Sequence, residues 1–269
     1  MRKPLTRARL SLRTIALLWL LIILVGPVTM VFYRAFEDGL GTFWTSISSH
    51  EAGHALYMTV IIALIAVPLN TVFGVALSIA IVRRKFPGKG LVNAFVDLPL
   101  ALSPVVVGLA LLLLYGRQGW VGPWFSEQGI RIVYALPAMV LATIFVSLPF
   151  VVREVVPVLR EIGDEQEQAA STLGAGSWQT FWRVTLPSIR WAVAYGIVLT
   201  AARSLGEFGA VNVVSGRITG QTETATLFID GAYTDFNQRG AYGVSVLLAA
   251  ISVLILVGMS IFKPKEETQ

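Results

Sequence analysis

Six long apolar runs dominate this sequence, and they limit the folds that it can adopt. Each run approaches or exceeds the roughly 20 apolar residues that cross a bilayer as a helix. The predicted spans are Thr14–Tyr33, Leu56–Val82, Leu91–Tyr115, Ile132–Val152, Trp191–Val214 and Tyr242–Phe262. Backbone amides inside lipid must be paired within their own segment, so the runs are expected to be helices. The sequence therefore predicts an all-α polytopic membrane protein with six transmembrane helices, in a single domain that covers residues 1–269.

Composition supports this class and excludes others. Charged residues make up only 14% of the 269 residues, whereas a soluble domain has about 25%. This shortage argues against a soluble enzyme, a disordered chain and a DNA-binding domain. The chain has no cysteine, which excludes disulfides and cysteine-ligated metals. A basic start before the first run is also typical of a secretory signal, but the run is long for one, so we expect a retained span.

The distribution of Lys and Arg predicts the orientation, because positively charged loops stay in the cytoplasm. Fifteen of these residues lie on one side of the predicted spans, five lie on the other, and Arg203 lies within the fifth span. The larger group is Arg2, Lys3, Arg7, Arg9, Arg13, Arg83, Arg84, Lys85, Lys89, Arg153, Arg160, Arg183, Arg190, Lys263 and Lys265. Both termini are therefore expected in the cytoplasm, together with the long connection at about 153–190.

That connection is expected to contain two short helices. The composition from Asp164 to Leu173 favours a helix, with acidic residues in the first turn, where the helix dipole stabilises them. Gly174 can take a positive φ and is expected to end this helix. Ser177 is expected to cap a second helix, and Pro187 to discourage its continuation. Either the connection is a docking surface for a partner, or it packs only on its own bundle.

The residues of this connection follow a spaced pattern. The chain reads Gln168-Ala169-Ala170, then three residues, then Gly174, then nine residues, then Val184-Thr185-Leu186-Pro187. This resembles the EAA loop of ABC-importer permeases, which reads Glu-Ala-Ala, three residues, Gly, nine residues, Ile-x-Leu-Pro. Gln168 replaces the usual Glu, and Val184 replaces Ile. Glu167 is an alternative acid, although a shift of one residue rotates a side chain by about 100° on a helix.

Four other motifs are similar to the sulfate and molybdate branch of these permeases: Asp97-Leu98-Pro99, Ser103–Leu109, Pro149–Glu154 and Arg203–Ala210. Val213–Gly216, with Gly220-Gln221-Thr222 following, is most similar to the W-type permease subunits of sulfate/thiosulfate importers. The resemblance implies the type I importer permease fold and alternating access across a bacterial-type inner membrane. A molybdate or tungstate permease is the alternative within the class, and an ATP-independent secondary transporter is the alternative outside it.

The resemblance also implies partners. Gln168, Ala169, Ala170, Gly174, Leu186 and Pro187 would couple the chain to two ATP-binding subunits. The chain lacks a phosphate-binding loop of its own, so it is expected not to be an enzyme and to hold no cofactor, with ATP and Mg on the partner. A second, non-identical permease and a periplasmic sulfate/thiosulfate-binding protein are expected to complete the importer.

Arg203 and Glu207 are the charges predicted inside the membrane. They are four residues apart in the fifth predicted span, so they are expected to share a helix face and pair. An unpaired arginine at the bilayer centre costs about 2.5–3.5 kcal/mol on insertion scales. The pair either locks two helices together, or Arg203 lines the translocation path of an oxyanion while Glu207 holds it. Asp97, near the inner end of the third span, is expected to cap or pair locally.

One motif suggests a different chemistry. His50-Glu51-Ala52-Gly53-His54 satisfies H-E-x-x-H, in which two histidines bind zinc and the glutamate acts as general base. A catalytic zinc needs a third protein ligand, and the chain has only 2 histidines. The motif also falls in a short outer loop, where Gly53 weakens the helix that would align it. We therefore expect an exposed polar helix start, with a zinc membrane protease as the rival to be tested.

Overall fold

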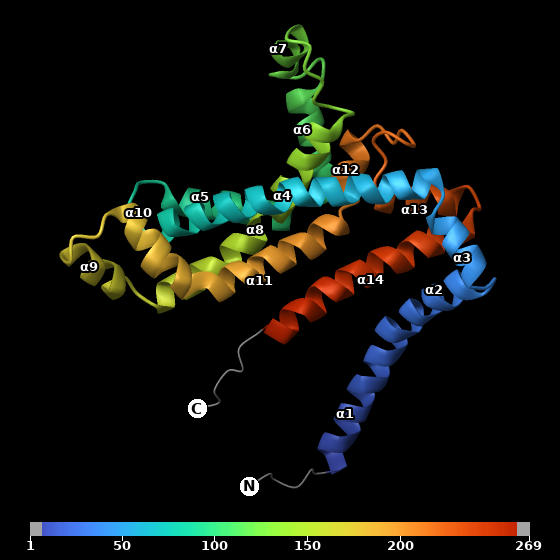
Figure 1. The fold of residues 1–269 in the computed structure, drawn as a ribbon, viewed down its shortest axis with the longest axis horizontal. Helices are drawn as coiled ribbons and strands as arrows, with labels where there is room; N and C mark the ends of the chain where they lie inside the picture. Colours follow the sequence, from blue (N-terminus) through green and yellow to red (C-terminus); the bar gives the residue numbers. More distant parts are fainter. Residues whose placement is uncertain (1–6, 263–269) are drawn as a thin grey trace.

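The computed structural model describes residues 7–262, and within that range helices are joined by turns and no β-strand forms (Figure 1). Five segments are long and apolar enough to span a membrane: Ser11–Phe36, His50–Arg83, Leu136–Glu161, Ser177–Leu205 and Gln238–Gly258. The bent pair Lys89–Ala101 and Pro104–Tyr115 is a sixth candidate. The all-α polytopic prediction is confirmed. Arg2, Lys3, Lys263 and Lys265, which contributed to the predicted orientation, lie outside the described residues.

The first span diverges from the other helices (Figure 1). It consists of α1 (Arg7–Leu20), the π-helical segment η1 (Leu21–Val25) and α2 (Gly26–Phe36), followed by α3 (Leu40–Ile47). Its contacts with the rest of the fold are made mainly by α2, against α14 (Gln238–Phe262) and α3. Since 0% of its most apolar window is buried, this surface requires lipid or another subunit to cover it.

Three spans form the centre of the molecule: α4 (His50–Arg83), α8 (Leu136–Glu161) and α11 (Leu186–Leu205). Ser49 caps the start of α4, where its side chain accepts a hydrogen bond from Ala52 N at 3.2 Å. Gly74 of α4 and Gly196 of α11 both face Val151 of α8. A Cβ on these glycines would lie 2.8 Å and 2.9 Å from atoms of Val151. Small residues thus allow the three backbones to approach closely.

A buried polar side chain fixes the register of α4 against α8. Asn70 is fully buried, and its Nδ2 donates to Ser147 Oγ at 2.8 Å and to Ile144 O at 3.2 Å. Ser147 Oγ donates in turn to Thr143 O. A displaced register would leave these polar groups unpaired inside the bundle, and a buried polar group without a hydrogen-bond partner is unfavourable.

The predicted third span is bent rather than straight. α5 (Lys89–Ala101) and α6 (Pro104–Tyr115) meet at 114°, and α6 with α7 (Gly122–Glu127) projects away from the central helices (Figure 1). The bend arises because a proline disfavours helical geometry in the residue before it, and Ser103 is extended, with ψ 136°. α6 packs on α12 (Gly209–Val214).

The predicted fifth span differs from the structure at both ends. A continuous helical segment of 29 residues runs through α10 (Ser177–Thr180), the π-helical η2 (Phe181–Thr185) and α11. Pro187 lies inside this continuous segment, two residues after the π-helical η2, and a local π-helical turn lets a spanning helix accommodate a proline. The expectation that Pro187 discourages the helix was therefore wrong. Ser177 begins α10, and Gly176 occupies the cap position. At its other end the helix stops at Leu205.

The chain after Leu205 turns back in short helices. α12 is separate from α11, and α13 (Ala225–Thr234) follows it and leads into α14. α13 packs on both α14 and the first turns of α4. Figure 1 shows α3 and α13 at one end of the central helices and α9 (Glu165–Thr172) at the opposite end.

Candidate functional site

The segment 153–190, named here the coupling segment, contains the end of α8, the helix α9, a glycine turn, α10, η2 and the first residues of α11. α9 agrees with the helix predicted from Asp164 to Leu173 to within one residue at each end. Gly174 has φ +85°, and Ala175 N donates to Ala170 O at 3.0 Å across the turn. The predicted stop at Gly174 is therefore confirmed, because a left-handed conformation favours glycine.

Three of the six predicted coupling residues, Ala169, Ala170 and Pro187, line an open groove of about 650 Å³. Its lining includes Ala169, Ala170, Leu173, Val184, Pro187 and the basic residues Arg183 and Arg190. Gln168, Ala169, Gly174 and Pro187 are exposed, whereas Ala170 and Leu186 are half-buried. Leu173 is 89% exposed, and the nearby Trp178 is 73% exposed. Large apolar side chains with a basic rim form a surface suited to a protein partner.

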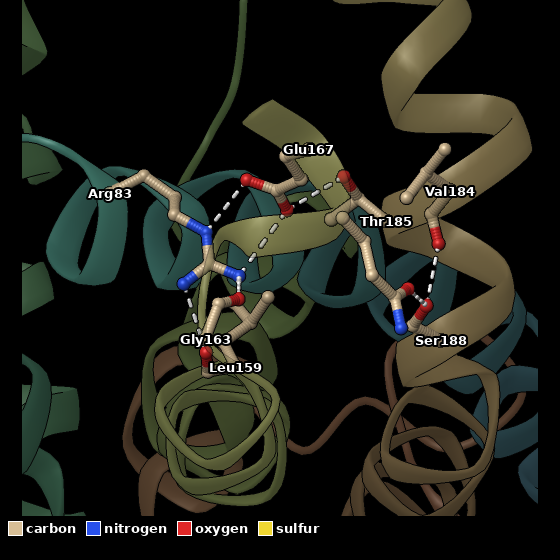
Figure 2. Close-up of polar contacts among 8 residues, drawn as sticks. Arg83, Leu159, Gly163, Glu167, Val184, Thr185 and Ser188 are labelled. Atoms are coloured by element: carbon tan, nitrogen blue, oxygen red, sulfur yellow. Dashed lines mark hydrogen bonds and ion pairs between the residues drawn. The ribbon is translucent and has the colours of Figure 1, made fainter. Parts of the chain in front are cut away.

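Arg83 and Glu167 join the coupling segment to the central helices (Figure 2). Arg83 Nε donates to Glu167 Oε2 at 2.8 Å, and Nη2 donates to Glu167 Oε1 at 3.3 Å. Glu167 Oε1 also accepts from Thr185 Oγ1 at 2.9 Å. The side chains of Arg83 and Glu167 are only 15% and 21% exposed. One carboxylate therefore connects the end of α4, α9 and η2.

Glu167, and not Gln168, is the inward-facing side chain of α9. Gln168 is exposed, and its backbone carbonyl accepts from Ser171 Oγ at 2.7 Å. The departure from the Glu-Ala-Ala pattern thus leaves an amide on the outer face, while the acid one position earlier forms the internal ion pair. Sequence analysis missed the role of Arg83, because 84 positions separate it from Glu167 and no local pattern relates them.

Arg203 and Glu207 form the predicted pair, although Glu207 lies beyond the end of α11. Arg203 Nη2 is 2.6 Å from Glu207 Oε2, outside the alignment of a hydrogen bond. The side chain of Glu207 is 2% exposed and that of Arg203 is 29% exposed. The expectation that both residues share one helix was wrong, because the helix ends at Leu205. The turn still brings the two charges together.

Glu207 is held by two further elements. Its Oε1 accepts from Ala210 N at 2.9 Å, in the first turn of α12, where N–H groups lack helical partners. Its backbone carbonyl accepts from Thr226 Oγ1 of α13 at 2.7 Å. The carboxylate is therefore fixed at the junction of α11, α12 and α13, and it keeps a partly exposed guanidinium in place beside it.

Comparisons with known proteins agree with this geometry. Residues 71–264 match the family described as "Binding-protein-dependent transport system inner membrane component". The "Sulfate transport system permease protein CysW" of Synechococcus elongatus is 52% identical over 92% of this chain and 87% of its own length. The protein of that name in Escherichia coli (strain K12) is 44% identical over 99% of this chain and 92% of its own. The chain belongs to this permease family.

The permease fold is also found in a solved transporter. A chain of a bacterial ABC transporter for alginate import superposes with a TM-score of 0.78, at 17% identity, over 96% of this chain and 95% of that one. At this identity the likeness shows the fold alone. It confirms the predicted ABC-importer permease fold. The permease is a transport subunit and not itself an enzyme.

Asp97 pairs with a distant residue of the permease. Arg153 Nη2 of α8 is 2.8 Å from Asp97 Oδ1 of α5, and both side chains are about half-exposed. The expectation of a local cap or pair was wrong, since 56 positions separate the two residues. An exposed pair of this kind contributes little to stability, about 0–1 kcal/mol.

Glu223 is a buried acid that sequence analysis did not single out. It lies in the turn before α13, is 8% exposed, and its Oε2 has no hydrogen-bond partner among the described residues. Burial raises the pKa of the Glu223 carboxyl, and a hydrogen bond from Thr219 opposes the shift. Two threonines flank it in the sequence, so neither hydropathy nor spacing indicated its burial.

The H-E-x-x-H motif lies at the first turn of α4. His50 is exposed and His54 is half-buried beside Tyr57, with ring centroids 6.2 Å apart. Within residues 7–262, no group of three or more His, Cys, Asp or Glu side chains could hold a metal ion. The motif forms the start of a spanning helix that Ser49 caps, as the expected polar helix start predicts.

Proposed function

We propose that the chain is a permease subunit of an ATP-driven importer that carries sulfate or thiosulfate across a bacterial-type inner membrane. The observation that carries the proposal is the 44–52% identity, over most of the chain, to proteins named as sulfate transport permeases. The charge of the proposed substrate fits the site, since a dianion requires positive compensation inside the membrane.

Coupling to ATP is assigned to the exposed face of the coupling segment. Gln168, Ala169, Ala170, Gly174, Leu186 and Pro187 would contact one of two ATP-binding subunits, which would hold ATP and Mg. The exposure of Leu173 and Trp178 supports this role, because apolar side chains of this size are unfavourable in water. The small side chains of Ala169 and Ala170 allow a partner surface to approach closely.

Translocation is assigned to the Arg203–Glu207 pair. The partly exposed guanidinium of Arg203 would ease the passage of the anion, and Glu207 would hold it in position. Because Glu207 already compensates this charge, the anion would be held weakly, which suits conduction, in which a transported ion must also leave. Selectivity would then come mostly from a separate binding protein.

The proposed assembly has several subunits. Relatives in Escherichia coli (strain K12) include permeases named both CysW and CysT, at 44% and 36% identity, which supports a second, non-identical permease. A solved relative, an alginate ABC transporter, is described in complex with a periplasmic protein, which supports a binding protein here. The Lys and Arg distribution supports cytoplasmic termini. Residues 1–269 would form one transmembrane domain in each importer.

The mechanism follows from this arrangement. ATP-driven closure of the two ATPase subunits would move the coupling segments. The spans of the two permeases would rock with them, so that the interface opens alternately outward and inward. In each state Arg203 would face a path connected to one side of the membrane only.

The function is tested by reconstituting the whole importer in vesicles and measuring uptake of labelled sulfate. Uptake should require ATP, the ATPase subunits and the binding protein, and thiosulfate should compete. Preferential uptake of molybdate or tungstate would favour the alternative substrate. Uptake by this chain without any ATPase would overturn the proposal. Gly174→Val, strained at φ +85°, should reduce co-purification of the ATPase subunits.

A further inference from the structure

Arg83 uses all three of its guanidinium nitrogens at the inner end of the central helices. Nε and Nη2 contact the Glu167 carboxylate, Nη1 donates to Leu159 O at 2.9 Å, and Nη2 donates to Gly163 O at 2.5 Å (Figure 2). Both carbonyls lie in or just after the last turn of α8, where C=O groups lack helical partners. A cation at this terminus is also stabilised by the helix dipole.

Arg83 is therefore the common point of four elements. It is the last residue of α4, it satisfies the end of α8, and it holds α9 through Glu167. Glu167 in turn accepts from Thr185, which is 5% exposed and ends η2 directly before α11. A lysine at position 83 could not make this set of hydrogen bonds, because a single ammonium group cannot match the planar fork of guanidinium donors.

α4 extends from this joint toward α13, which contacts Glu207. The helix has 34 residues, so it is about 50 Å long at 1.5 Å per residue. Near its other end, Thr59 Oγ1 accepts from Ala225 N at 2.8 Å. The next residue, Thr226, donates to Glu207 O. Hydrogen bonds and one helix thus connect the coupling segment to the backbone carbonyl of Glu207, the residue whose carboxylate holds Arg203.

We infer that Arg83 is a positioning residue, which fixes α9 to the ends of α4, α8 and η2 so that a displacement of α9 moves the helices α4, α8 and α11 together. This inference rests on the proposed function, in which a partner ATPase moves the coupling segment. In this inference, the ATPase moves the exposed groove, and the Arg83–Glu167 ion pair transmits that motion to the central helices.

The test measures the joint directly in the assembled importer. The chain has 0 cysteines, so Lys85→Cys and Glu165→Cys add two spin-label sites, both exposed, while the partner subunits are made cysteine-free. Their distance distribution should be narrow in the otherwise unchanged protein. Arg83→Gln should broaden it, and Arg84→Gln should not, because Arg84 is exposed and has no ion pair within the described residues.

The same variants are compared for sulfate transported per ATP hydrolysed. Because single changes in coupling networks alter coupling by about 0.5–2 kcal/mol and 1.4 kcal/mol is a factor of ten, Arg83→Gln should lower this ratio by about twofold to thirtyfold, with ATPase subunits still bound. The transport ratio of Arg83→Lys should fall between that of Arg83→Gln and that of the unchanged importer. If Arg83→Gln does not assemble, Glu167→Gln, which keeps an oxygen that can accept from Thr185, provides the same two readouts.

The outcomes separate the two proposals. A narrow distance distribution in both the Arg83 and the Glu167 variant overturns the inference, as does an unchanged transport ratio when the distribution broadens. An unchanged importer that moves no sulfate contradicts the proposed function instead, and the label distances then still decide whether Arg83 fixes the coupling segment.

Discussion

The close approach of α8 and α11 predicts that Gly196→Ala destabilises the protein. In Gly196→Ala, the new Cβ would lie 2.9 Å from Val151 Cα, a backbone atom. Carbon atoms normally stay about 3.5–4.0 Å apart, so the two helices must separate by about 0.6–1 Å. Overpacking of this kind costs about 1–3 kcal/mol. Since 1.4 kcal/mol is a factor of ten, the folded-to-unfolded ratio should fall by about 5- to 150-fold.

The assay is SDS titration of the protein in mixed micelles, followed by tryptophan fluorescence. Gly53→Ala is the matched control, because a Cβ there meets no atom within 4 Å. It should raise the free energy of unfolding by about 0.5–1 kcal/mol, as alanine favours a helix over glycine. Equal stability of Gly196→Ala and Gly53→Ala would refute the close packing of the central helices.

A double-mutant comparison locates the contact further. In Gly74→Ala, the new Cβ meets Val151 Cβ and Cγ1, both at 2.8 Å. Val151→Gly removes these two atoms but leaves the Cα that Gly196→Ala meets. The second change should therefore rescue Gly74→Ala much more than Gly196→Ala, as a difference in coupling energy. Equal rescue of both would contradict this geometry.

Three further predictions concern the functional residues. Arg203→Ala should leave assembly intact and lower sulfate uptake by about tenfold or more, because the transported anion would lose one charge-assisted hydrogen bond. Normal uptake in vesicles would exclude a transport role. Leu173→Asp should lower ATPase co-purification by at least about tenfold, because docking would bury an unpaired carboxylate, while Leu173→Met should retain it; equal retention would remove Leu173 from the interface. The raised pKa of Glu223 means that its burial favours folding while the carboxyl is protonated, so stability should fall as pH rises from its ordinary value of 4.5 through the raised pKa. Glu223→Gln should flatten this dependence in thermal unfolding from about pH 4 to 8, and an unaltered slope would contradict it.

The coupling segment shows what local sequence can predict. The helix at α9 and the stop at Gly174 followed from acidic residues in a first turn and from a residue that takes positive φ, both of which act within a few positions. The sequence also showed that Gln168 replaces the usual Glu of the pattern, but it did not show which acid would face inward instead. Which acid faces inward depends on where α9 lies relative to Arg83, and that is a tertiary relation.

The sequence by itself determined the membrane class and the approximate places of the spans, because hydropathy and backbone pairing in lipid act on each run separately. The family was indicated separately, by the resemblance of spaced motifs such as Gln168–Pro187. The tertiary structure alone decided three features: the angle of 114° between α5 and α6, the end of α11 before Glu207, and the surroundings of Arg83, Asp97 and Glu223. These depend on contacts between residues far apart in the chain or on competition between a local turn and packing. Neither kind of information is present in the periodicity of a single segment.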